Sequence, residues 1–134
     1  MVDVLSRNSW KQFERGTYME ESKMIPKSEW VWYGFACHFI GSRNCEYHLG
    51  TRIGNRLIST VGAYNPHEEE SYVALGLDED SFFETMIFEC GGEDEHGNPI
   101  VPNWIELYVE RYSESLNAER GHRALCERVA KGEI

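Results

Sequence analysis

The chain has 134 residues, of which 23 are acidic and 13 are basic, and its formal net charge is −10. This length fits one domain, residues 1–134, in which residues 1–28 form an N-terminal extension that packs on or beside the core. A hydrophobic fraction of 41% argues against a disordered chain. The acidic balance would repel a polyphosphate backbone, so we expect no general nucleic-acid binding. An acidic surface suits solubility, or docking on a basic partner.

No segment approaches the roughly 20 apolar residues of a membrane span, and the first residues lack the basic and apolar regions of a secretory signal. We therefore expect a cytoplasmic protein without a membrane partner. In that compartment the four cysteines, Cys37, Cys45, Cys90 and Cys126, are expected to be free thiols or metal ligands rather than disulfides.

The first predicted elements are a short helix and a buried strand. Ser9 can cap a helix that runs to Arg15, and Gly16 follows at the position of a C-terminal cap. The run from Trp30 to Ile40 is almost wholly apolar and aromatic, which favours a strand buried on both faces at the centre of the core.

A hairpin is predicted next. The segments 47–53 and 56–64 are joined by Gly54-Asn55, a glycine-first pair that favours a type II′ turn. A regular hairpin then places four pairs of residues opposite each other: Ile53 and Arg56, Thr51 and Ile58, Leu49 and Thr60, His48 and Val61.

The second half of the chain predicts more strands and one terminal helix. Segments 72–77, 82–89 and 104–112 are strand candidates, and residues 91–103 form a long polar loop. Ser113 or Ser115 can cap a helix that ends at Lys131-Gly132, with a buried stripe of Ala118, His122, Leu125 and Val129 beside Cys126. The expected fold is α+β: a mainly antiparallel sheet of five to six strands packed by the C-terminal helix.

The only cofactor that the residues suggest is zinc. Cys45, His48, His122 and Cys126 carry the thiolate and imidazole ligands that zinc prefers, with His38 as an alternative ligand. His122 and Cys126 stand one helical turn apart, but Cys45 and His48 would face opposite ways on a regular strand. The site therefore requires a turn at residues 44–47; otherwise these are ordinary buried residues.

Three polar residues on predicted strands are candidates for a ligand pocket: Glu84, Ser59 and Thr60. Glu84 interrupts an apolar strand and would serve as a general base or binding group if it is buried with a raised pKa. The alternative is a carboxylate turned to solvent or paired with an arginine such as Arg111. Ser59 and Thr60 precede Gly62, where a ligand can approach the backbone, although a strand is an unusual place for a phosphate cradle.

Several short motifs, in this order, resemble a family of small uncharacterised proteins encoded by tailed bacteriophages. These motifs are His38-Phe39, Cys45-x-x-His48, Thr51-x-x-Gly54, Ser59-Thr60-Val61-Gly62, Phe83-Glu84-Thr85-Met86-Ile87-Phe88, Tyr112 and Gly121-His122. The resemblance covers roughly residues 34–130 and brings no site assignment with it. It implies an accessory protein of the host cytoplasm that acts by occupying a host factor.

Three functions are compatible with these observations. The first is a non-enzymatic phage accessory binding protein, for example an inhibitor of a host or anti-phage defence factor, whose partner is a host protein or a small signalling ligand. The second is a small zinc-dependent enzyme with its site near Cys45, His48 and His122. The third is a structural virion component, for which an obligate homo-oligomer is expected.

Overall fold

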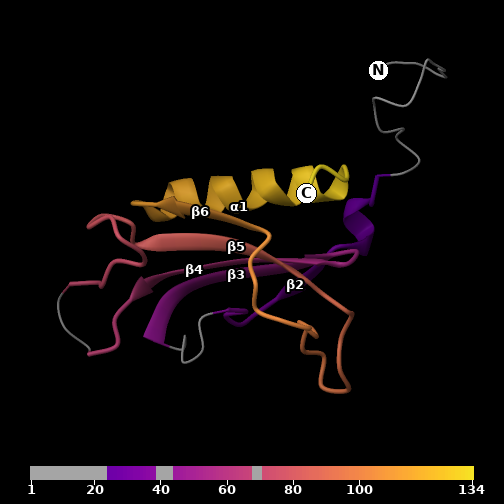
Figure 1. Cartoon of the computed structure of the whole chain (residues 1–134), viewed down its shortest axis with the longest axis horizontal. Helices are drawn as coiled ribbons and strands as arrows, with labels where there is room; N and C mark the ends of the chain where they lie inside the picture. The colour runs from indigo at the N-terminus through magenta and orange to yellow at the C-terminus, as the bar shows by residue number, and fades with distance from the viewer. Residues whose placement is uncertain (1–23, 39–43, 68–70) are drawn as a thin grey trace, which may run out of the picture.

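The computed structural model describes residues 24–38, 44–67 and 71–134. Within these residues, five strands form one antiparallel sheet in the order β2-β3-β4-β5-β6, and a single helix, α1, lies across one face (Figure 1). The elements are the 3₁₀ turn η2 (Lys27–Glu29), β2 (Val31–Tyr33), β3 (Cys45–Ile53), β4 (Arg56–Tyr64), β5 (Phe83–Glu89), β6 (Tyr108–Tyr112) and α1 (Ser115–Ala130). The α+β prediction is confirmed. The helix predicted over residues 9–15 lies outside the described residues.

The hairpin prediction is confirmed in detail. All four predicted pairs between β3 and β4 are opposite each other, from Ile53 and Arg56 at the turn to His48 and Val61. Gly54 has a φ of 60°, as the first position of a type II′ turn requires, and glycine reaches this conformation without steric cost.

The prediction of a central strand at residues 30–40 is wrong. Within the described residues 30–38 only Val31–Tyr33 is a strand, and it lies at one edge of the sheet, where Trp32 is 43% exposed. Beyond Gly34 the chain leaves that edge, and Cys37 and His38 become buried against the sheet face opposite the helix. The apolar run is therefore divided between an edge strand and a covering segment, and periodicity cannot distinguish this from one long strand.

Two other strand predictions also need correction. Residues 72–77 make only an isolated bridge between Val73 and Tyr64. In the segment 104–112 the strand starts at Tyr108.

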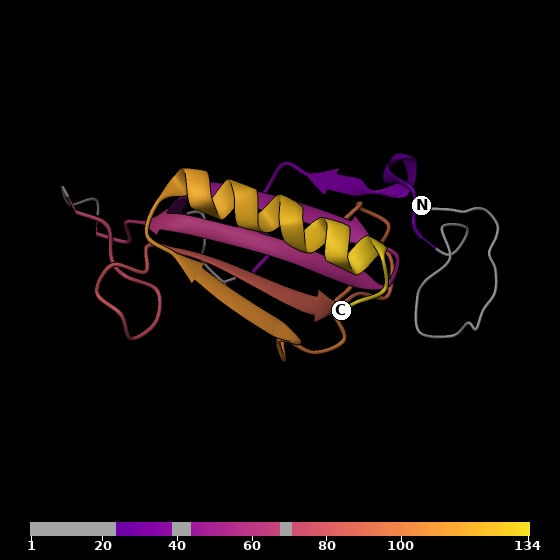
Figure 2. The same ribbon diagram turned by 90° about the horizontal axis from the view of Figure 1, so that it is seen from above.

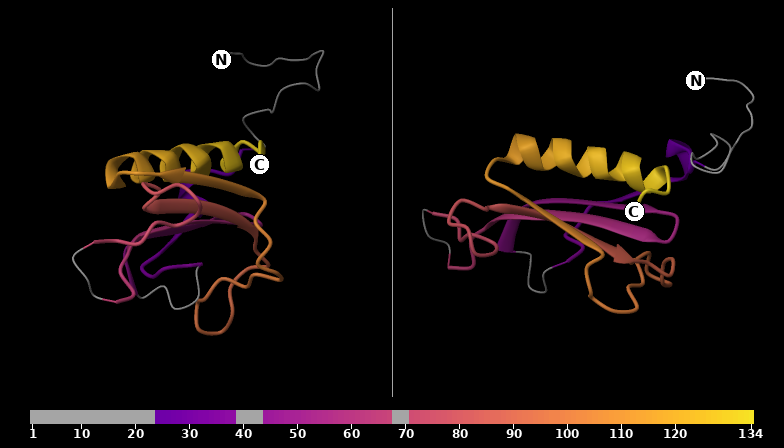
Figure 3. Two further views of the ribbon diagram at one scale, coloured as in Figure 1. Left: turned by 60° about the vertical axis from the view of Figure 1, so that its left-hand side comes forward. Right: turned by 45° about the horizontal axis from the view of Figure 1, so that its top comes forward.

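The sheet has a buried cluster on each face. On the face covered by α1, which we call the helix face, Ile53, Ile58 and Ile87 pack against Leu125, Cys126 and Val129. On the opposite face, Leu57 and Phe88 pack with Cys37 and Cys90. Residues 34–38, which follow β2, and the segment that joins β5 to β6 lie on this opposite side (Figures 1 and 3).

The terminal helix has its predicted end but not its predicted cap. Glu114 occupies the N-cap position and makes no side-chain capping bond, so the prediction of a Ser113 or Ser115 cap is wrong. At the other end, Gly132 has a φ of 81°, its amide donates to Val129, and the Glu133 amide donates to Arg128, which is a Schellman motif.

The predicted apolar stripe of α1 is buried, and it includes His122 and Cys126. Among the described residues, no helix has the length and apolar character needed to cross a membrane.

Candidate functional site

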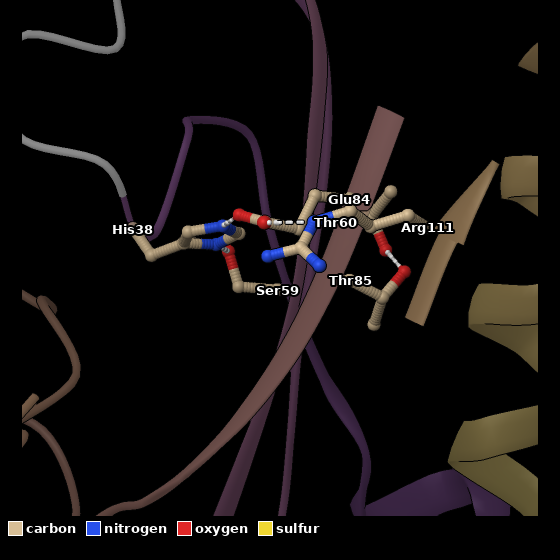
Figure 4. Close-up of polar contacts among 6 residues, drawn as sticks. All are labelled: His38, Ser59, Thr60, Glu84, Thr85 and Arg111. Atoms are coloured by element: carbon tan, nitrogen blue, oxygen red, sulfur yellow. Dashed lines mark hydrogen bonds and ion pairs between the residues drawn. The ribbon is translucent and has the colours of Figure 1, made fainter. Parts of the chain in front are cut away.

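A polar network lies on the sheet face opposite the helix, with His38 at its centre. Ser59 on β4 is 2.7 Å from His38 Nδ1, and Glu84 Oε1 on β5 is 3.2 Å from His38 Nε2. Arg111 on β6 donates through Nε to Glu84 Oε2 at 2.9 Å. The residues reach one another from the 34–38 segment and from three neighbouring strands (Figure 4).

The hydrogen bonds and charges around Glu84 keep its carboxyl group ionised. Burial alone would raise the pKa of Glu84, but the hydrogen bond and charge of His38, together with the charge of Arg111, outweigh it and lower that pKa. Glu84 is therefore a carboxylate that only accepts, so His38 Nε2 donates to it. His38 Nδ1 and the Ser59 hydroxyl share the second hydrogen bond, in which a neutral ring would accept and a charged ring would donate. A histidine between a hydroxyl and a carboxylate has the polarity of a nucleophile-activating triad.

The side chains of this network are buried, which excludes contact between the Ser59 hydroxyl and a substrate. Ser59 is 0% exposed and His38 and Glu84 are each 6% exposed, so no substrate can contact the hydroxyl while the network stays closed. Glu84 is buried, but its pKa is lowered rather than raised, so the condition for a general base is not met, and Glu84 pairs with Arg111 as the alternative expected. The network joins three strands through buried, satisfied hydrogen bonds, which is a structural role.

A second polar network lies on the helix face around His122. Its Nε2 is 2.8 Å from Thr51 Oγ1 on β3, and its Nδ1 is 2.7 Å from Thr60 Oγ1 on β4. Thr60 bonds in turn to Thr85 on β5. Burial lowers the pKa of His122 to about 4, so its ring is neutral near pH 7.

This second network continues to the surface through Tyr112. Thr85 hydrogen bonds to the Tyr112 hydroxyl, which donates to Glu110 Oε1 at 2.7 Å. Gly121 on α1 makes the close approach possible, because a Cβ placed there would lie 2.2 Å from the Tyr112 hydroxyl. Residues of five of the motifs described in the sequence thus meet in one hydrogen-bonded row between sheet and helix: Thr51, Thr60, Thr85, Tyr112 and His122.

The structure does not bring the four predicted zinc ligands together. Cys45 and His48 belong to one strand, so the turn at residues 44–47 that the site required is not present. His122 already uses both ring nitrogens on Thr51 and Thr60. Among residues 24–38, 44–67 and 71–134, no group of three or more His, Cys, Asp or Glu side chains is placed to hold a metal.

Burial also makes the thiols poor ligands and nucleophiles. It raises the pKa of Cys45 to about 11 and that of Cys126 to about 12. Cys126 packs in the helix-face cluster, whereas Cys45 packs with Val61 and Leu75. His38, the alternative ligand, is held by Ser59 and Glu84.

The three pocket candidates lie on two faces. Ser59 and Glu84 belong to the His38 network, whereas Thr60 belongs to the His122 network on the other side of the sheet (Figure 4). Sequence reasoning missed the partners of Thr60, although the adjacent polar pairs Ser59-Thr60 and Glu84-Thr85 carried a signal. Neighbouring residues of a strand point to opposite faces of the sheet. Each adjacent polar pair therefore places one polar side chain on the helix face and one on the opposite face.

An exposed apolar surface precedes and enters β6. We call it the 100–109 surface, and its large side chains are 38% to 68% exposed: Ile100, Trp104, Ile105, Leu107 and Val109. Trp104 stands edge-on to the buried ring of Phe88, with ring centroids 5.1 Å apart, so this surface is anchored to the core.

The chain around this surface is acidic. Residues 89–110 contain six carboxylates, Glu89, Glu93, Asp94, Glu95, Glu106 and Glu110, and neither lysine nor arginine. Of these, Glu93 is engaged by Arg52 and Tyr33, and Glu110 by Tyr112.

Comparison with known proteins finds no family model, no curated protein and no solved structure that matches the chain.

Proposed function

We propose that this chain is a non-enzymatic binding protein of the phage accessory type, which acts by occupying a basic surface of a host protein such as a defence factor. The observation that carries the proposal is the 100–109 surface, an exposed apolar patch within an acidic stretch of the chain. Contiguous exposed apolar side chains rimmed by polar residues are typical of protein interaction sites.

The apolar part of the surface has the features of an interface centre. Trp104 and Ile105 are 53% and 68% exposed, so they offer area that a partner can bury. Tryptophan is enriched among residues that dominate binding energy, and its contact with Phe88 limits the conformational freedom lost on binding.

The charge of the surface selects the partner. Residues 89–110 contain six carboxylates and no lysine or arginine, Arg52 pairs with only one of these carboxylates, Glu93, and the chain as a whole carries −10. Such a surface accelerates encounter with basic proteins and discriminates against acidic ones and against nucleic acid.

The buried networks favour binding over catalysis. The side chains best suited to acid–base chemistry, His38, Glu84 and His122, are at most 6% exposed and use their polar atoms on each other or on hydroxyls. No described residue favours the zinc enzyme, and no observation favours the virion component over the binding protein.

The test is a matched capture experiment followed by reconstitution. Tagged chain, an Ile105→Ser variant and a Leu77→Ser control are exposed to lysate of a bacterium that tailed phages infect. Leu77 is the matched control because it is a fully exposed leucine in a different loop. We expect the unmodified chain and Leu77→Ser to retain the same basic protein. Ile105→Ser should retain at least about tenfold less of it, because truncating a central apolar contact costs more than 1 kcal/mol of binding free energy.

The retained protein is then purified, and its affinity is measured by calorimetry at two salt concentrations. Affinity should fall as salt rises, since the contact is between opposite charges. Equal retention by all three forms, or an affinity that salt leaves unchanged, would contradict the proposal.

A further inference from the structure

The sheet ends in a strand whose outer side has no partner among the described residues. β6 is the last strand of the order β2-β3-β4-β5-β6 and pairs only with β5 (Figure 2). It has five residues, whereas the opposite edge strand, β2, has three. An end strand presents backbone donors and acceptors that another chain can pair with.

The side chains of β6 alternate between the two faces of the sheet. Tyr108, Glu110 and Tyr112 alternate with Val109 and Arg111, and Arg111 lies on the face opposite the helix because it bonds Glu84 there. Val109 therefore presents an exposed apolar side chain on that face, as the last residue of the 100–109 surface. Glu110 presents a carboxylate on the helix face.

We infer that β6 accepts an extended basic segment of the partner as a sixth strand, with apolar side chains beside Val109 and lysine or arginine side chains beside Glu110. This inference rests on the proposed function and names how the partner is held. Directly opposite residues of paired strands interact across each face, so an alternating basic and apolar sequence matches β6 on both.

Charge argues against a second copy of the chain as the occupant. Antiparallel pairing of two β6 strands centred on Glu110 would set the two carboxylates against each other. The register one residue away would set Glu110 against Arg111, but it would turn the helix faces of the two copies to opposite sides. In either register each copy carries a net charge of −10. Like charges directly opposite each other destabilise a strand pair, whereas a lysine or arginine opposite Glu110 would attract its carboxylate.

The probe is a capped synthetic peptide of alternating lysine and valine, Lys-Val-Lys-Val-Lys-Val-Lys, titrated into the full chain. Two isomers complete the set, one N-methylated at the three valine amides and one at the last three lysine amides. In an added strand, alternate amides point toward the sheet and away from it. We therefore expect one isomer to bind more than about tenfold more weakly, since it loses several hydrogen bonds, and the other to bind like the parent.

Two further measurements locate the contact. Amide exchange by NMR should slow in β6 when the parent peptide binds. Glu110→Gln should weaken the parent peptide by up to about fivefold, the worth of one cross-strand ion pair.

The outcomes separate this inference from the proposed function. Equal binding of both N-methyl isomers, or no binding of the parent peptide, overturns strand addition and leaves the capture result with Ile105→Ser standing. Retention lost in Ile105→Ser, together with isomer-dependent peptide binding, supports both.

Discussion

The stability of the fold should depend on pH through His122. The ring is fully buried, and its pKa falls from 6.5 to about 4 on folding. The unfolded chain therefore binds a proton that the folded chain excludes, and acid favours unfolding. This contribution to stability is fully present above pH 6.5 and is lost as the pH falls toward 4. A difference of 6.5 − 4 = 2.5 pKa units is worth about 3 kcal/mol in total, at 1.36 kcal/mol for each unit.

Most of that loss occurs in a convenient window. Between pH 7 and pH 5 the His122 contribution alone lowers the free energy of unfolding by about 2 kcal/mol. The assay is urea unfolding followed by tryptophan fluorescence at both pH values, in the unmodified chain, in His122→Gln and in His96→Gln. His96 is exposed, so its variant should keep the pH dependence, whereas His122→Gln should lose that part of it.

The hydrogen bonds of His122 give a second readout on the unmodified chain. The row from His122 to Glu110 ends in a carboxylate, which can only accept, so each hydroxyl must donate toward it. His122 Nδ1 then donates to Thr60, and Nε2 accepts from Thr51. Nitrogen NMR should show a neutral His122 ring with its proton on Nδ1, and the ring should gain a second proton only near pH 4. A His122 that titrates near 6.5, or equal pH dependence in all three proteins, would refute the reasoning.

Three more predictions concern packing and charge. Gly121→Ala should destabilise the chain by about 1–3 kcal/mol despite the better helix propensity of alanine, because the new Cβ would lie 2.2 Å from the Tyr112 hydroxyl; Gly34→Ala, with nothing within 4 Å, should be neutral in the same urea assay. Glu84→Gln should lower the free energy of unfolding by about 2 kcal/mol at pH 7, relative to the unmodified chain. The lowered pKa of Glu84 means that the difference should shrink as the pH falls below 4, which unfolding at pH 3 measures. The four buried cysteine thiols should react with a disulfide reagent in native protein far more slowly than in urea, and fast native labelling would contradict their burial.

Local signals in the sequence predicted part of this fold well. The hairpin register followed from a glycine-first turn and from strand alternation, both of which act between near neighbours. The stripe of α1 followed from helical periodicity for the same reason. The segment 30–40 failed because burial on both faces and burial as a cover over a sheet produce the same apolar run, and only tertiary contacts separate them.

The candidate sites depended on contacts that sequence spacing does not contain. His38 lies 46 residues from Glu84, and Thr51 lies 71 residues from His122. The zinc hypothesis grouped cysteine and histidine residues because their side chains are zinc ligands. It did not consider which face of the sheet each side chain lies on. Face could have been inferred from alternation, because the confirmed hairpin register already places Thr51 and His48 on opposite sides of β3.

The two networks together explain why this sheet has one register. Thr60 lies opposite Thr85, while Ser59 and Glu84 lie diagonally across the same strand pair on the other face. Sliding β5 past β4 by one residue would turn Glu84 into the helix face and Thr85 away from His122. Each buried polar group would then lose its partners at a cost of about 1–3 kcal/mol, and the ionised Glu84 would cost more. Adjacent polar residues with partners on opposite faces therefore penalise any slip on both sides at once, which purely apolar strands would not do.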